Sequence, residues 1–331
     1  MADKARQATD KQLRKMERRI ESIYKEAQDG ITQQWNKYME NAEKRLSSLQ
    51  NAYDKALKSG DSEKIKEARN ALEKAQKNVT IRDQYYKDMV AETTARITEA
   101  NQIALAYLNG QLPSVYAVNY NAIASQADKV GIAFNIVNEN TVKNLITDGD
   151  IKLPRKKISI PKDMAWNTKQ LNSSVLQGIL QGESMNKIAG RIYPIVENNA
   201  AAAIRNARTM VTGAENRGRQ DSYEDLEERG AVVKKVWIAT PDSRTREAHL
   251  AMDGQEVDIN EDFTDGDGNK IAYPGDPSAE PSTVYNCRCS MRTHIIGFGK
   301  ADGRIERLTE RSRDTLHKEQ IKEEREDRKG D

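Results

Sequence analysis

The sequence has few of the features that stabilise secreted and membrane proteins. Its 331 residues include only two cysteines, Cys287 and Cys289, at a spacing that rarely allows a relaxed disulfide. We therefore exclude a disulfide-stapled scaffold and expect folding in a reducing cytoplasm. No apolar run reaches the roughly 18 residues of a membrane helix, and we expect no secretory signal in the charged residues 1–15.

Aromatic residues are also scarce. They make up 5% of the chain and hydrophobic residues 37%, whereas 31% of residues are charged and the mean hydropathy is -0.84. This composition excludes one large globule of average make-up and favours long solvated helices over two or three domains. The net charge of +2 gives no sign of nucleic-acid affinity for the whole chain. Residues 1–230 nevertheless carry a net +6, and residues 231–299 a net -4.

Two long helices are predicted for residues 1–112. Apolar residues recur at spacings of three and four over residues 13–57, which would be about 67 Å long as a single helix. Residues 58–62, Lys-Ser-Gly-Asp-Ser, are typical of a helix that stops and restarts. The apolar stripe then resumes and ends at residues 109–113, where Asn, Gly and Pro stand. A short loop between two such helices predicts an antiparallel helical hairpin.

The remaining chain predicts a mainly α protein with a small β-rich C-terminal module, in the α+β class. Residues 113–165 are expected to be a mixed linker region, in which residues 153–158 form a loop or a short edge strand. Residues 166–230 predict a helical middle domain built of shorter pieces. At residue 231 the pattern changes to β-formers and turn residues, which predicts a compact β-rich module over residues 231–299. Residues 300–331 predict a charged helical or disordered tail.

The β-rich module gathers the residues that a metal ion would use. It holds both cysteines and two of the three histidines, and thiolate and imidazole are the ligands that zinc prefers. We predict that Cys287 and Cys289 share one face of a strand, with His249 as third ligand and His294 or, alternatively, Asp242 as fourth. The competing interpretation is that these are small buried residues with a hydrogen-bonded histidine, because the spacing matches no common zinc finger.

A second group of residues lies just before His249. Asp242, Arg244, Thr245 and Arg246 predict a structural turn, since an Asp–Arg pair can hold a turn through bidentate hydrogen bonds. The alternative is a nuclease-like or ADP-ribosyltransferase-like enzyme, with Arg244 holding phosphate beside Thr245 and His249 acting as acid or base. No second acid or base lies at a spacing that would indicate a catalytic pair, so no catalytic residue is predicted.

The sequence from Asp265 to Asn269, Asp-Gly-Asp-Gly-Asn, begins like a calcium loop. A calcium loop needs glycine at its sixth position, where Lys270 stands here, so a β-turn is the favoured interpretation.

Residues 178–297 resemble the Mu-F-like minor head proteins of tailed bacteriophages, the head morphogenesis family. The resemblance rests on short motifs that are weak singly and specific in this order and spacing. They are Gly182, Lys187-Ile188-Ala189-Gly190-Arg191-Ile192, Ala207-Arg208-Thr209, Asn216-Arg217-Gly218-Arg219, Trp237-Ile238-Ala239-Thr240, the Asp242–Arg246 turn with His249, Asp253-Gly254-Gln255, Pro274-Gly275-Asp276-Pro277 and Asn286-Cys287-Arg288-Cys289.

The resemblance implies a structural, non-enzymatic minor head protein. Such a protein acts in procapsid and head assembly at or near the portal and stays in the virion, after a time in the host cytoplasm. The implied partners are the portal, scaffold and capsid proteins. Self-association through the hairpin and contact with packaged DNA through the basic helical part are further expectations. One departure is visible: the family often has an acidic residue after Ala-Arg-Thr, where Met210 stands here, so an ion pair of the relatives would be missing or rebuilt.

Overall fold

The computed structural model describes residues 4–78, 84–129, 131–181, 187, 190–299 and 305–307. The motif residues 182–186 and 188–189 and the tail residues 308–331 lie outside the described residues. The chain divides into two compact units, each described by itself. The helical unit holds Arg19–Leu105 and Lys157–Ala203, and the mixed unit holds Met1–Arg18, Ala106–Lys156 and Ile204–Asp331. No helix within the described ranges is both long and apolar enough to cross a membrane.

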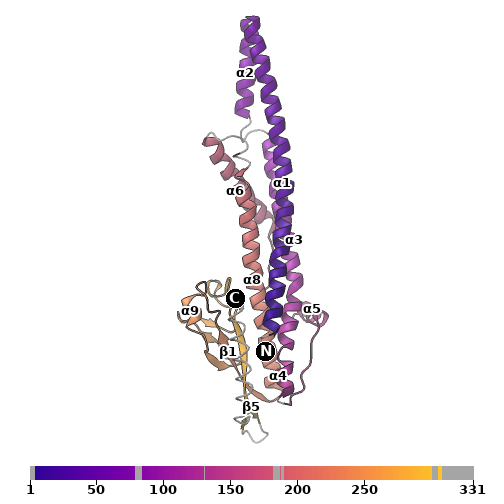
Figure 1. Cartoon of the computed structure of the whole chain (residues 1–331), viewed down its shortest axis with the longest axis vertical. Helices are drawn as coiled ribbons and strands as arrows, with labels where there is room; N and C mark the ends of the chain where they lie inside the picture. The colour runs from indigo at the N-terminus through magenta and orange to yellow at the C-terminus, as the bar shows by residue number, and fades with distance from the viewer. Residues whose placement is uncertain are drawn as a thin grey trace. The chain divides into compact units, whose positions relative to one another are not determined.

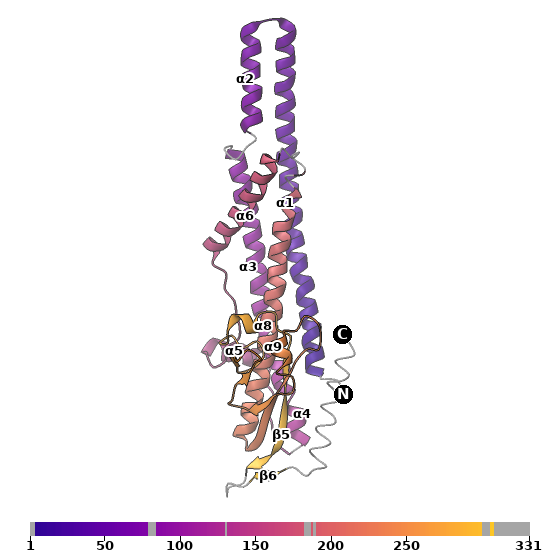
Figure 2. The same cartoon turned by 90° about the vertical axis from the view of Figure 1, so that its left-hand side faces the viewer.

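The predicted stop and restart between the first two helices is confirmed. Helices α1 (Lys4–Ser59) and α2 (Ser62–Asn78) run antiparallel on either side of a short turn (Figures 1 and 2). Gly60 takes a φ of 69°, the left-handed conformation that suits glycine after a helix end. The side chain of Asp61 then accepts the backbone N–H groups of Glu63 and Lys64 at 3.1 and 3.3 Å, which caps α2.

The predicted helix end at residues 109–113 is wrong. Helix α3 runs from Gln84 to Asn121 with Pro113 inside it, although a proline removes one backbone hydrogen bond and costs about 3 kcal/mol. Leu112 and Val115 on either side are 0% exposed, so burial of these apolar side chains offsets the local cost.

A buried polar cluster joins three helices of the helical unit. Asp163 lies on α6 (Ile160–Leu180), and its carboxylate accepts hydrogen bonds from Thr98 at 2.7 Å, from Asn101 at 3.0 Å and from Asn167 at 3.0 Å. Asn199, on α8 (Tyr193–Glu228), donates to Asn167 and accepts from Asn101. Because each polar group has partners only in one alignment, this cluster fixes the register of α3, α6 and α8.

The β-rich module of the mixed unit is confirmed as small antiparallel sheets. Four strands pair in the order β2-β1-β5-β6, and a two-stranded hairpin, β3 with β4, stands beside them (Figure 1). In the central pair, Trp237 on β1 lies opposite Met291 on β5, and both side chains are buried. The strands are β1 (Ala231–Ile238), β2 (Glu256–Asp258), β3 (Phe263–Thr264), β4 (Lys270–Ile271), β5 (Ser290–Gly299) and β6 (Ile305–Arg307), and the short helices of this unit are α4 (Ala124–Lys129), α5 (Glu139–Asp148), α9 (Glu247–Leu250) and α10 (Pro281–Val284).

The Asp265 segment is a turn, as predicted. It connects β3 to β4, and the Asp265 carboxylate accepts the backbone N–H groups of Asp267 and Asn269 at 2.9 and 2.8 Å. An aspartate that bonds the backbone two residues ahead is typical of tight turns.

Residues 153–158 are a loop, the first of the two predicted alternatives. Two other expectations about segments need correction. The middle region contains long helices, since α6 begins at Ile160 and α8 is a single helix of 36 residues. Residues 305–307, expected in a helical or disordered tail, form strand β6 and pair with Gly297–Gly299 of β5, because an otherwise open sheet edge accepts their backbone.

We predict that Asp163→Ala destabilises the helical unit by about 2–4 kcal/mol, because it leaves several buried donors without an acceptor. Urea unfolding followed by far-UV circular dichroism measures this loss. Lys162→Ala, an exposed change on the same helix, should shift the midpoint little. Equal midpoints for the two variants would contradict the role of the cluster.

Candidate functional site

The last family-like motif, Asn286 to Cys289, lies in a loop that enters the core. The prediction that both cysteines sit on a strand is wrong, because β5 begins only at Ser290. Asn286 has a φ of 57°, the one described non-glycine residue with a positive φ. This left-handed residue reverses the chain after α10, so that Cys287 and Cys289 point inward and are 3% and 2% exposed.

One polar stripe of α8 holds this loop. The Thr209 hydroxyl accepts the Asn286 N–H at 2.8 Å, and Thr212 donates to the Cys287 carbonyl at 2.7 Å. Asn216 donates to the Cys289 carbonyl at 3.2 Å. These residues recur at spacings of three and four, so they face one side of the helix. The irregular backbone of the loop is thereby satisfied inside the protein, where water cannot do it.

Arg219 extends the stripe by one more turn. Its guanidinium donates to the Met291 carbonyl at 3.0 Å and to the Asn119 side chain on α3 at 3.2 Å, and it pairs with Glu215 at 3.4 Å. Arg219 is 6% exposed and Glu215 7%. A buried charge is tolerated only with an opposite charge and hydrogen bonds, and Arg219 has both. We call Thr209, Thr212, Asn216 and Arg219 the α8 clamp.

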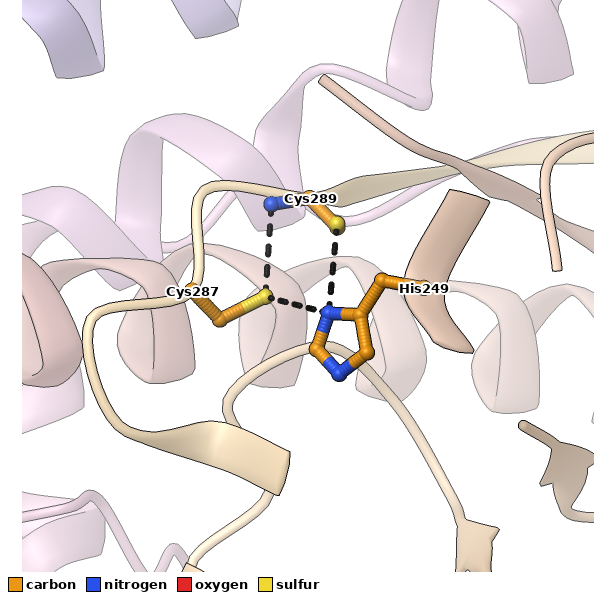
Figure 3. A group of neighbouring side chains, drawn as sticks. All are labelled: His249, Cys287 and Cys289. Carbon is orange, nitrogen blue, oxygen red and sulfur yellow. Dashed lines mark hydrogen bonds between the residues drawn. The ribbon is translucent and has the colours of Figure 1, made fainter. Parts of the chain in front are cut away.

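The cysteines meet His249 in a buried cluster. Nδ1 of His249 lies 3.6 Å from Sγ of Cys287 and 3.7 Å from Sγ of Cys289, and it faces both sulfurs (Figure 3). The donor atoms of the three residues all lie within 4.8 Å of one another. The His249 ring is 1% exposed and packs edge-on against Trp237. We call these three residues the Cys–His cluster.

The two cysteines of the cluster shift each other's pKa in opposite directions. The hydrogen bond from Cys287, helped by His249 and by the backbone of Thr240, lowers the pKa of Cys289 to about 5 despite burial. The same bond to Cys289, together with burial, raises the pKa of Cys287. A backbone N–H also reaches Cys287, since that of Cys289 lies 3.4 Å from its sulfur. The loop is therefore built to hold at least one thiolate.

The turn before His249 is structural, and its main partner is an arginine that the sequence did not suggest. Arg288 holds both carboxylate oxygens of Asp242, one of them at 2.7 Å. The Arg244 backbone N–H also donates to Asp242 at 2.9 Å. The hydrogen bonds from Arg288 keep the pKa of Asp242 well below its usual range. Arg288 lies between the two cysteines, so this ion pair ties the turn to the cysteine loop.

The other predicted site residues do not converge on a reactive centre. The Arg244 side chain is 74% exposed, and the Thr245 hydroxyl donates to the Thr240 carbonyl at 2.6 Å. Arg246 donates to the Tyr285 carbonyl. His249 faces the sulfurs from its buried position, so the nuclease-like or transferase-like arrangement is not formed here.

Neither predicted fourth metal ligand joins the cluster. His294 lies on β5, where its Nδ1 is 2.9 Å from a carboxylate oxygen of Glu256. Asp242 is held by Arg288. Among the residues that the structure describes, only His249, Cys287 and Cys289 form a group that could hold a metal ion.

Two more family-like motifs have packing roles. Gly213 on α8 touches the loop at Gly275, and a Cβ on Gly213 would lie 2.7 Å from the Gly275 carbonyl oxygen. Only glycine permits this approach. Met210, which stands where the family resemblance leads us to expect an acidic residue, is 0% exposed in the core. The arginine before it is paired elsewhere, since Arg208 donates to Glu17 at 2.8 Å.

Comparisons with known proteins support the resemblance. Residues 169–292 match the family described as Phage Mu protein F like protein. The chain is 25% identical over 200 residues to "Minor head protein GP7" of Bacillus phage SPP1, which covers 58% of this chain and 63% of that protein. It is 28% identical over 175 residues to "NAD(+)--arginine ADP-ribosyltransferase EFV" of Enterococcus faecalis, which covers 52% of this chain and 35% of that protein. The chain thus spans less than two thirds of either relative, and no solved structure matches it.

We predict that Arg219→Met loosens the cysteine loop and lowers stability by about 3–5 kcal/mol, because it leaves Glu215 as a buried charge without its partner. Hydrogen–deuterium exchange should rise at the amides of residues 286–291. Arg205→Met is the matched control, since Arg205 is an exposed arginine of the same helix. Unchanged exchange at 286–291 in the Arg219 variant would refute the clamp.

We predict that Asp242→Asn is destabilising at neutral pH, by on the order of 1 kcal/mol at this partly exposed site. The folded-state pKa of Asp242 is lowered, so its stabilisation is present above the unfolded pKa near 4 and is lost as the pH falls through the folded pKa. The stability gap between wild type and variant should therefore be constant from pH 7 to 5 and shrink below about pH 4. Urea midpoints measured across this range test it, with the exposed Asp267→Asn as control. A gap that persists unchanged at the lowest pH would contradict this assignment.

Proposed function

We propose that this chain is a minor head protein acting in head assembly at or near the portal, because residues 169–292 match the Mu protein F like family and the chain is similar to a minor head protein of a Bacillus phage. In this proposal it works beside the portal, scaffold and capsid proteins and is retained in the virion. The matched region includes α8, strands β1 to β4 and the cysteine loop, and it ends at the start of β5.

The main observation in favour of a structural role is that the polar motif residues bond to other parts of the protein. Thr209, Asn216 and Arg219 bind the backbone of the cysteine loop, and Asp242 binds Arg288. The polar groups of these residues have their hydrogen-bond partners inside the protein. Residues that bind or transform a substrate must instead present polar groups to a cavity.

A transferase is the second candidate, because one relative carries that name. The match covers 35% of that relative, so its activity need not lie in the shared part. The separation of Arg244, Thr245 and His249 gives no support to catalysis by those three residues. A DNA-binding role through the basic residues 1–230 rests on charge alone, and such binding would weaken steeply with added salt.

We expect the chain to co-sediment with procapsids assembled from the head proteins encoded beside it, in a few copies per particle, and to remain in mature virions. Quantitative mass spectrometry of gradient-purified particles measures this. Particles assembled without portal protein should contain much less of the chain. Its absence from both procapsids and virions would end the proposal.

Two controls separate the alternatives. Purified chain incubated with labelled NAD⁺ and an arginine-rich acceptor should transfer no label above a blank. Binding to duplex DNA should be absent near physiological salt. Label transfer that is lost in Arg244→Ala would favour the enzyme instead.

A further inference from the structure

The Cys–His cluster is a group of chemically reactive side chains that assembly of a phage head does not require. Its three donor atoms come from two separate segments, α9 and the loop before β5. All three residues are at least 97% buried. Burial on this scale leaves little room for a solvent-borne substrate and favours a small bound species.

The spacing of the donor atoms suits a tetrahedral metal ion. With a zinc–sulfur bond of about 2.3 Å and a zinc–nitrogen bond of about 2.05 Å, a tetrahedral angle puts sulfur and nitrogen about 3.6 Å apart. The His249 Nδ1 lies 3.6 and 3.7 Å from the two sulfurs. All three donors face a common point (Figure 3).

The charge of the cluster also suits a divalent ion. Two thiolates and a neutral imidazole neutralise one Zn²⁺, and a neutral group is the least costly to bury. Backbone N–H groups of Cys289 and Thr240 are directed at the two sulfurs and would stabilise the thiolates. Soft sulfur ligands with one imidazole select zinc over the hard cations calcium and magnesium.

The orientation of the His249 ring fits metal binding through Nδ1. Nδ1 faces both sulfurs, whereas Nε2 is buried and has no hydrogen-bond partner among the described residues. When Nδ1 binds a metal, Nε2 carries the proton. A metal-bound histidine ordinarily donates that N–H to a second group, so we expect a buried water to accept it.

We propose that His249, Cys287 and Cys289 bind one zinc ion through Nδ1 and the two sulfurs. No His, Cys, Asp or Glu among the described residues offers a fourth ligand, so a water molecule completes the tetrahedron. The ion would fasten α9 to the cysteine loop. This proposal is independent of the proposed role in head assembly.

The test uses the full chain without a histidine tag, purified under reducing conditions. We expect about one zinc per chain by elemental analysis. After the zinc is replaced with Co²⁺, a thiolate-to-cobalt charge-transfer band should appear in the near ultraviolet and saturate at one equivalent. Because Cys287 and Cys289 are the only cysteines of the chain, that band can come from no other residue.

Substitutions locate the third ligand and provide controls. Zinc content should fall at least tenfold in Cys287→Ser, Cys289→Ser and His249→Ala. It should stay at one per chain in His294→Ala and His317→Ala, which remove the other two histidines. X-ray absorption at the zinc edge should fit two sulfur and two nitrogen or oxygen ligands.

The cobalt spectrum of the wild type decides the matter even where a variant fails to fold. Wild-type chain that is folded by circular dichroism, fully reduced and still free of zinc and of the charge-transfer band would overturn the site. Zinc that persists in the Cys287→Ser/Cys289→Ser/His249→Ala variant would overturn it as well. If a normally folded His294→Ala variant lost its zinc, His294 and not water would be the fourth ligand, and the proposed ligand set would be wrong.

Discussion

The mixed unit depends on satisfying the backbone of one irregular segment, residues 286–289, together with the first residues of β5 that follow it, inside a core. A loop at that depth carries carbonyl and N–H groups that neither a helix nor a sheet supplies with partners, and each group left unpaired would cost about 1–3 kcal/mol. The α8 clamp supplies those partners from the side chains of one rigid helix face. The position of the loop then sets the positions of both cysteines, of Arg288 and of the start of β5.

Several family-like motifs that are far apart in the chain acquire one explanation from this constraint. Thr209, Asn216 and Arg219 hold the loop, and Gly213 lets a second loop approach α8 at Gly275. The Asp242 turn is fastened to the same loop by Arg288. The N-terminal end of α1 reaches it too, since Arg6 donates to the Ser290 hydroxyl at 2.6 Å. The motif set thus describes how α8, the Asp242 turn and the cysteine loop are held together.

Sequence patterns predicted the parts of the fold that depend on apolar periodicity. The first helix, the turn at Gly60 and the change to strands at residue 231 follow from local rules. The helix end predicted at residues 109–113 was wrong because burial of Leu112 and Val115 in the folded protein outweighs the local cost of Pro113 inside a helix. The α8 clamp was missed because polar residues at helical spacing also describe a solvated face, and only the fold shows which face is covered. The grouping of His249 with the cysteines was predicted. The prediction for His294 was wrong because it assumed that the cysteines lie on a strand. They lie in a loop, and His294 lies on another surface.

Both units reach the same solution to a shortage of apolar residues. In the helical unit, Asp163 and its amide and hydroxyl partners fix three helices in one register. In the mixed unit, Arg219 does the same for α8, α3 and the cysteine loop. Such networks add modest net stability, since removing water from polar groups offsets much of each bond, but they penalise any other alignment severely. These networks therefore help to specify one structure for a chain in which only 5% of the residues are aromatic.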